Sequence, residues 1–203
     1  MKRFIIVLFA LLFITTGCQK EEKIENPIVT MTIKDYGEVK LELYPSIVYN
    51  TVANFVSLIE DGFYNENTIH RLVENFVIQG GDPTATGTGG PGYTIKGEFA
   101  LNGVNNGIVH ETGVISMARG DDYNSAGSQF FIVLDDSARY SLDGKYASFG
   151  KVIEGMDVID NIERSGLEIK ENSSGMLVNP LTIESMTVDT KGHDYQLEKY
   201  QKN

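Results

Sequence analysis

Short stretches in which apolar and polar residues alternate recur along most of the chain. Residues 28–33 and 39–44 alternate in this way on either side of the polar turn at residues 34–37, which predicts a β-hairpin. Six further segments have the same strand character and are separated by glycine-rich or acidic turns: residues 68–72, 76–79, 113–117, 130–134, 147–153 and 181–188. Many short strands of this kind indicate a β-sandwich or a β-barrel.

Two segments have apolar residues at helical spacing instead. In residues 51–60 the apolar positions that fall on one helical face are Val52, Phe55, Val56 and Ile59. Asn50 or Thr51 is expected to cap the N-terminus of this helix, and Gly62 is expected to end it. A second helix is predicted after Gly155, with an apolar face formed by Met156, Ile159 and Ile162.

The N-terminus has the character of a targeting segment. Lys2 and Arg3 precede an unbroken apolar run over residues 4–14. As a helix, these eleven residues would cover only about 16 Å, well short of the roughly 30 Å hydrocarbon core of a bilayer. A signal peptide over residues 1–17 therefore fits better than a membrane-spanning helix.

The only cysteine, Cys18, comes directly after Gly17 at the end of this segment. The arrangement resembles the lipobox of bacterial lipoproteins, although Thr15 stands where Leu is usual. The resemblance implies that Cys18 is lipidated and becomes the mature N-terminus, held at the extracytoplasmic side of the cell membrane. The alternative is an ordinary cleaved signal followed by an unpaired cysteine. Residues 18–27, which are polar and end at a proline, are interpreted as the lipidated cysteine and its tether.

The C-terminus differs in character from the rest of the chain. Residues 28–189 are expected to form the folded domain, whereas residues 190–203 are mostly polar and lack a sustained apolar stripe. This composition predicts a loosely attached tail. The tail also contains apolar side chains that could pack on the domain, at Tyr195, Leu197 and Tyr200, so the sequence leaves this packing open.

Composition and charge restrict the function further. The 203 residues include 28 Asp and Glu against 17 Lys and Arg, for a formal net charge of -11. A polyanionic partner would meet net repulsion, so nucleic acid is not expected as a ligand. The three histidines are isolated from one another in sequence, and His110-Glu111 lacks the second histidine of an H-E-x-x-H motif. No metal site is predicted.

Three separate segments carry the most specific pattern in the chain. The first joins residues 69–72 (IHRL) to residues 76–82 (FVIQGGD), and the others are residues 113–118 (GVISMA) and 124–132 (NSAGSQFFI). Together they resemble the signature of the cyclophilins, a family of peptidyl-prolyl cis-trans isomerases. The resemblance implies a mostly β fold, a closed eight-stranded antiparallel barrel capped by two α-helices, and an enzyme without a cofactor.

The resemblance assigns catalytic roles to Arg71, Gln79 and Phe131. Arg71 matches the family arginine that hydrogen-bonds toward the proline nitrogen, whose lone pair becomes available when the amide is twisted out of resonance. An interaction made mainly in the transition state accelerates the reaction, instead of only tightening binding. Gln79 and Gln129 match the two glutamines that hold this arginine and hydrogen-bond the substrate backbone.

The other matched residues are expected to bind the substrate. The apolar floor and walls that receive the proline ring are matched by Phe76, Val77, Phe131 and Leu142. Ala118 and Arg119 match the backbone stretch that pairs with the extended peptide, and many relatives have Asn where Arg119 stands. Only the main chain of Arg119 is implicated by the resemblance.

Two departures from the family pattern affect the rim of this pocket. Tyr140-Ser141 stands before Leu142 where many cyclophilins have Trp next to the pocket Leu, and Tyr146 stands where they have His. Tyrosine keeps an aromatic face and a hydrogen-bonding tip, so Tyr146 is expected to bind substrate. In relatives the indole N–H donates to the inhibitor cyclosporin, so the resemblance implies markedly weaker binding of cyclosporin to this chain.

These observations lead to one predicted function and one alternative. The prediction is a lipid-anchored isomerase that rotates X-Pro bonds of unfolded or flexible exported proteins and assists their folding. The alternative is a non-catalytic chaperone or scaffold that holds proline-containing segments on the same barrel. The presence of Arg71, Gln79, Gln129 and Phe131 together favours catalysis.

Overall fold

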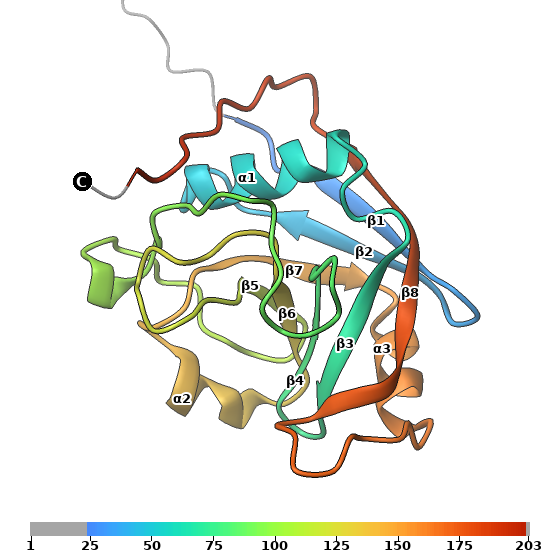
Figure 1. Ribbon diagram of the computed structural model, residues 1–203. Helices are drawn as coiled ribbons and strands as arrows, with labels where there is room; N and C mark the ends of the chain where they lie inside the picture. Colours follow the sequence, from blue (N-terminus) through green and yellow to red (C-terminus); the bar gives the residue numbers. More distant parts are fainter. Residues whose placement is uncertain (1–23, 202–203) are drawn as a thin grey trace, which may run out of the picture.

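Eight antiparallel strands close into a barrel in the computed structural model, which describes residues 24–201. The order around the barrel is β1-β2-β7-β5-β6-β4-β3-β8 (Figure 1). The strands are β1 (Ile28–Ile33), β2 (Gly37–Leu43), β3 (Asn67–Val73), β4 (Val77–Gly80), β5 (Val114–Met117), β6 (Phe130–Val133), β7 (Ser148–Glu154) and β8 (Met176–Asp189). This confirms the expected closed eight-stranded antiparallel barrel. The predicted signal peptide and Cys18 lie outside the described residues.

Strand β8 closes the barrel, and it is longer than the sequence pattern predicted. Its first half pairs with β3 and its second half pairs with β1. The strand was predicted over residues 181–188, after Asn179-Pro180. The strand instead begins at Met176, on the far side of this pair.

Within residues 24–201, three α-helices accompany the barrel, one more than expected. Helix α1 (Tyr49–Glu60) and helix α3 (Met156–Arg164) are the two predicted ones, and they lie at opposite ends of the barrel (Figure 1). The additional helix, α2 (Arg139–Leu142), follows a 3-10 turn at Asp136–Ala138. It spans four residues, which is too short to produce a recognisable helical period. None of the helices within residues 24–201 is long and apolar enough to cross a membrane.

Helix α1 ends as predicted but begins differently. Gly62 has a φ of 70°, and the N–H groups of Gly62 and Phe63 donate to the last turn of the helix, which is a Schellman motif. The predicted N-cap is wrong, because neither Asn50 nor Thr51 caps the helix with its side chain. The carboxylate of Glu98 instead accepts the N–H of Thr51 (2.6 Å) and that of Asn50 (3.4 Å). A cap supplied from so far along the chain has no local sequence signal.

The strands carry apolar residues on both faces. The barrel interior holds the main core, whose largest fully buried aromatic side chains are Tyr64, Phe55, Phe99, Phe130 and Phe149. A smaller apolar cluster lies on the opposite side of strands β4, β5 and β6, beneath the segment that contains α2, and consists of Val77, Val114, Phe131, Val133, Ala138 and Leu142. This outer cluster forms the floor of the site described below.

The C-terminal segment is docked along α1, so the expectation of a loosely attached tail is wrong for residues 190–201 (Figure 1). Tyr195 is only 9% exposed, and its ring lies 5.8 Å from that of Tyr49. The backbone N–H of Glu198 donates to the Asn50 side chain, and that of Tyr200 donates to the Thr94 carbonyl. The segment is held by backbone hydrogen bonds and single aromatic rings, which need no apolar stripe.

Two buried histidines predict how stability depends on pH. Burial lowers the pKa of His70 more than the charge of Asp82 raises it, and burial lowers the pKa of His110 more than Asp143 raises it. Within the described residues neither ring nitrogen of His70 has a hydrogen bond of good geometry, and the backbone of Thr68 only partly offsets the effect of burial on the pKa. Below the ordinary histidine pKa of about 6.5, these two histidines take up protons in the unfolded chain but resist protonation in the folded chain. The free energy of unfolding is therefore unaffected by them above this pH and decreases as the pH falls below it.

We therefore expect the urea concentration at the midpoint of unfolding to decrease when the pH is lowered from 7.5 to 5.5. His70→Leu is expected to reduce this fall, because it removes one of the two groups that resist protonation. Urea unfolding of both proteins at the two pH values measures the difference. An equal decrease of the urea midpoint in wild type and variant would show that His70 does not contribute to the pH dependence of stability.

Candidate active site

The pairing of neighbouring strands places the predicted catalytic side chains next to one another. Arg71 in β3 is opposite Gln79 in β4, and Gln79 is opposite Phe131 in β6. Directly paired residues of adjacent strands point to the same side of a sheet. These three residues, of which Phe131 is far from the other two in sequence, therefore form one row on the outer face of the barrel.

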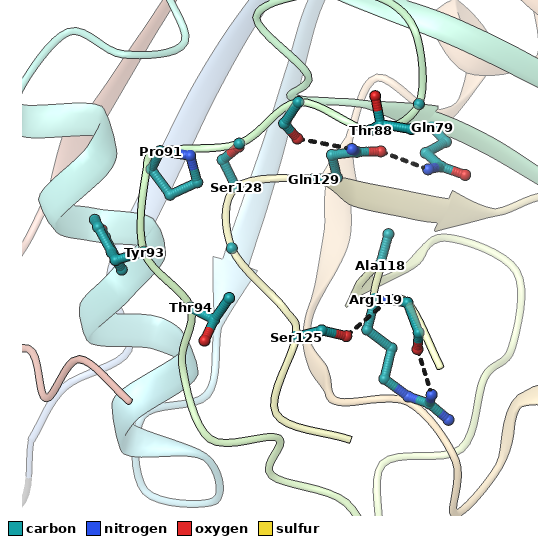
Figure 2. Close-up of a pocket in the computed structure, with 15 residues that line it drawn as sticks. Gln79, Thr88, Pro91, Tyr93, Thr94, Ala118, Arg119, Ser125, Ser128 and Gln129 are labelled. Carbon is teal, nitrogen blue, oxygen red and sulfur yellow. Dashed lines mark hydrogen bonds between the residues drawn. The ribbon is translucent and has the colours of Figure 1, made fainter. Parts of the chain in front are cut away.

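Hydrogen bonds connect Arg71 through both predicted glutamines to a loop. Arg71 Nη1 donates to Gln79 Oε1 (3.1 Å), and Gln79 Nε2 donates to Gln129 Oε1 (2.9 Å). Gln129 Nε2 then donates to the Gly89 carbonyl (2.9 Å), as the dashed lines in Figure 2 show for the two glutamines. Arginine can only donate, so the amide oxygen of Gln79 has to face it and the amide NH2 group of Gln79 faces Gln129. Each side chain in the series therefore donates to the next group.

Arg71 is held at a second point and remains a cation. Its Nε donates to the carbonyl of Ser174 in the segment before β8 (2.6 Å). Burial lowers the pKa of the Arg71 guanidinium from its ordinary value, but an arginine keeps its charge at neutral pH. The site therefore presents a fixed positive donor with limited freedom to move.

The loop at the end of this hydrogen-bonded chain is organised by Asp82, a residue that the sequence analysis did not assign to the site. Asp82 is buried, and its carboxylate accepts the backbone N–H groups of Thr84, Thr86, Gly87 and Gly89. Burial alone raises the pKa of Asp82, but the hydrogen bonds from Thr84, Gly89 and Gly87 outweigh it and lower the pKa to about 2. An Asp before a Thr- and Gly-rich loop is the local signal that could have identified it.

The predicted site residues gather around two adjoining pockets. A pocket of about 170 Å³ is lined by Arg71, Phe76, Val77, Gln79, Ala118, Arg119, Phe131, Leu142 and Tyr146. Gln129 instead lines a neighbouring pocket of about 410 Å³, which it shares with Gln79, Ala118 and Arg119 (Figure 2). On its other side this larger pocket is bordered by the loop that carries Pro91, Tyr93 and Thr94.

Phe131 is fixed from behind by residues that the sequence analysis did not assign to the site. The ring of His110 stacks on Phe131, with centroids 6.1 Å apart and planes at 20°. His110 Nδ1 lies 2.8 Å from Asp143 Oδ1, and its Nε2 lies 3.0 Å from Ser116 Oγ. Buried on all sides, His110 holds the back of Phe131 while Tyr146 meets its ring edge to face at 5.7 Å.

The rim of the smaller pocket differs from the family pattern as expected. Tyr140 is 84% exposed, Ser141 is also exposed, and neither lines the pocket. Both lie in α2, where the backbone is helical. Neither residue therefore contributes to the wall at the position where the resemblance places the Trp of many relatives, whereas Tyr146 does line the pocket.

Comparison with known proteins identifies the family. The family model described as cyclophilin type peptidyl-prolyl cis-trans isomerase matches residues 28–188. This match covers most of the chain and all the residues of the two pockets. The chain belongs to the cyclophilin family.

Relatives and solved structures agree with this assignment. The chain is 44% identical to peptidyl-prolyl cis-trans isomerase B of Bacillus subtilis over 130 residues, which cover 64% of this chain and 86% of the relative. It is 39% identical to a Helicobacter pylori peptidyl-prolyl cis-trans isomerase over 150 residues, which cover 73% of this chain and 88% of the relative. A crystal structure of a Cryptosporidium parvum cyclophilin type isomerase superposes with a TM-score of 0.70 at 29% identity, covering 81% of this chain and 98% of that one.

This cyclophilin is therefore an enzyme, a peptidyl-prolyl cis-trans isomerase. Rotation about a peptide bond is opposed by a barrier of about 18–20 kcal/mol, because resonance holds the amide planar. A site for this reaction has to hold a proline ring in an apolar pocket and to present a donor to the nitrogen of the twisted bond. The smaller pocket supplies both kinds of group, in Phe131 and Arg71.

Arg71→Ala tests the predicted catalytic role of the arginine. We expect this variant to remain folded and to isomerise X-Pro peptides about a hundredfold more slowly, since removing one preorganised transition-state donor typically has an effect of this size. Isomerisation of a short Ala-Pro peptide measures the rate. Arg164→Ala serves as the control, because Arg164 is an exposed arginine in α3. Normal activity of a folded Arg71→Ala variant would contradict the predicted role.

Proposed function

We propose that this cyclophilin isomerises X-Pro bonds in exported proteins while it is anchored by a lipid at Cys18 to the extracytoplasmic side of the cell membrane. The observation that carries the proposal is the order of features at the N-terminus. Lys2 and Arg3, the short apolar run at residues 4–14 and Gly17-Cys18 follow one another as in a lipoprotein signal.

The position of the folded domain supports an anchor close to the barrel. Strand β1 begins at Ile28, only a short distance along the chain from Cys18. The carbonyl of Pro27 accepts the N–H of Leu43, and Ile24 packs against the main core. A lipidated Cys18 therefore places the barrel near the membrane surface, where newly exported chains emerge.

The proposed substrates are unfolded or flexible proline-containing proteins. Uncatalysed isomerisation takes tens to hundreds of seconds, during which an exported chain without a formed core is exposed to proteolysis and aggregation. A second crystal structure of the Cryptosporidium parvum protein, obtained in the presence of the dipeptide Ala-Pro, superposes on this chain with a TM-score of 0.69. A pocket of about 170 Å³ beside a larger one suits a proline ring with an attached peptide.

Cys18→Ala tests the anchor. The wild-type protein, expressed in a bacterium that processes lipoproteins, is expected in the membrane fraction with a lipid on Cys18, because a doubly acylated terminus binds membranes stably. The Cys18→Ala variant is expected to lack the lipid and to leave the membrane fraction. Mass spectrometry of the N-terminal peptide and fractionation measure these outcomes. Wild-type protein that is unlipidated and free in the medium would favour the ordinary cleaved signal instead.

The altered rim predicts weak binding of cyclosporin. Wild type offers no indole donor at the rim, so we expect Ser141→Trp to increase the affinity at least about tenfold, the combined effect of a hydrogen bond and an aromatic contact. Tyr140→Trp is the matched control, because residue 140 is 84% exposed and lies outside the pocket. Calorimetric titration measures the affinities. Tight binding by wild type, with no gain from Trp at residue 141, would contradict this account of the rim.

A further inference from the structure

In the part of the chain that the structure describes, the lining of the two pockets contains arginines but no carboxylate, although the protein is acidic. Among the described residues, Arg71 and Arg119 are the only charged ones that line either pocket, and no Asp or Glu lines them. In the whole chain, acidic residues outnumber basic ones by 28 to 17. Within residues 24–201, neither arginine forms a salt bridge. The two pockets therefore contain positive charges that no carboxylate among the described residues of their lining neutralises.

The side chain of Arg119 is held rigidly by neutral groups. Its Nε donates to the Lys145 carbonyl (3.0 Å), and its Nη1 donates to the Gly120 carbonyl (2.8 Å). Three aromatic rings also surround its guanidinium carbon, with centroids 4.8–5.1 Å away: Tyr146, Tyr123 and Phe99. Cation–π contacts and carbonyl bonds fix the orientation of a guanidinium and leave its formal charge in place.

Arg119 lies where the two pockets meet. It lines both of them, as does Ala118 beside it in the chain. Figure 2 shows Arg119 across the larger pocket from the loop that carries Pro91 and Thr94. A peptide whose proline ring fills the smaller pocket and whose chain continues into the larger one passes Arg119 with the residue next to the proline.

We propose that Arg119 is a specificity-determining residue that selects an acidic side chain, Glu or Asp, next to the proline of the substrate. A carboxylate at this position forms charge-assisted hydrogen bonds with the guanidinium. The cost of ordering the arginine is already met by its aromatic and carbonyl contacts. The inference rests on the isomerase activity of the chain and does not depend on the membrane anchor.

Matched peptides that differ only in charge test this selectivity. We would measure kcat/KM for peptides containing Glu-Pro and Gln-Pro, and for a second pair containing Pro-Glu and Pro-Gln. In one of the two pairs the Glu peptide is expected to be favoured by about three- to fivefold, the effect of one partly exposed ion pair. The preference is expected to fall toward one between 0.05 and 0.5 M salt, about where screening becomes effective over contact distances.

Variants assign the preference to Arg119. In Arg119→Gln the ratio of kcat/KM for the Glu peptide to kcat/KM for the Gln peptide is expected to fall to about one. Lys34→Gln is expected to keep the wild-type ratio. Lys34 is an exposed cation in the turn between β1 and β2 and lies outside both pockets. The wild-type ratio needs no variant, so a folding defect in Arg119→Gln does not prevent the test.

Two outcomes overturn the inference. One is a wild-type enzyme that turns over Ala-Pro peptides but treats Glu and Gln equally in both pairs. The other is a preference for Glu that persists in a folded Arg119→Gln variant. Activity on Ala-Pro peptides in either case separates a failure of this inference from a failure of the isomerase function.

Discussion

The register of strands β3, β4 and β6 is the constraint on which the site depends. Side chains alternate between the two faces of a strand, so the pairing that places Ile78 and Phe130 in the barrel interior also places Gln79 and Phe131 outside. A slip by one residue would exchange the two faces. The packing of the interior core therefore fixes the position of the catalytic row, and the site acquires its geometry from the stability of the barrel.

The outer face can support a site because it has a small apolar core of its own. Phe131 packs there with Val77 and Leu142 under the segment that contains α2, and His110 fills the space behind its ring. Hydrogen bonds in such a dry environment are stronger than in water. The chain of donors from Arg71 to the Gly89 carbonyl runs along the edge of this cluster, and Asp82 holds the loop in which it ends.

The rim of the smaller pocket is built without tryptophan. Tyr140 and Ser141 are both exposed, and neither lines the pocket. Tyr146 instead forms part of the wall, with its ring between Phe131 and the guanidinium of Arg119. The same arginine that supports this ring carries a positive charge at the junction of the two pockets. Support of the wall and selection of the substrate are thus combined in one side chain.

The sequence alone determined most of the barrel and named many of the residues that line the two pockets, but not Asp82 or His110, which support them. Alternation identified the strands because each has one face in the core. Arg71, Gln79, Gln129 and Phe131 could be named because they stand in short segments that resemble the cyclophilin signature. Properties that depend on contacts between distant segments could not be predicted. These include the Glu98 cap on α1, the start of β8 before Pro180, and the docking of the C-terminal segment.

Tertiary structure also decided what Arg119 and Asp82 do. The sequence around Arg119 says little about its surroundings, since a lone arginine is most often a solvated surface charge. The Thr- and Gly-rich loop after Asp82 is a local signal, but it does not show that the carboxylate is buried. Only folding brings Phe99, Tyr123 and Tyr146 around one guanidinium, and only folding buries a carboxylate beneath the loop of residues 84–89. Periodicity and motifs are properties of the chain itself, whereas the surroundings of a charge are set by segments that meet when the barrel closes.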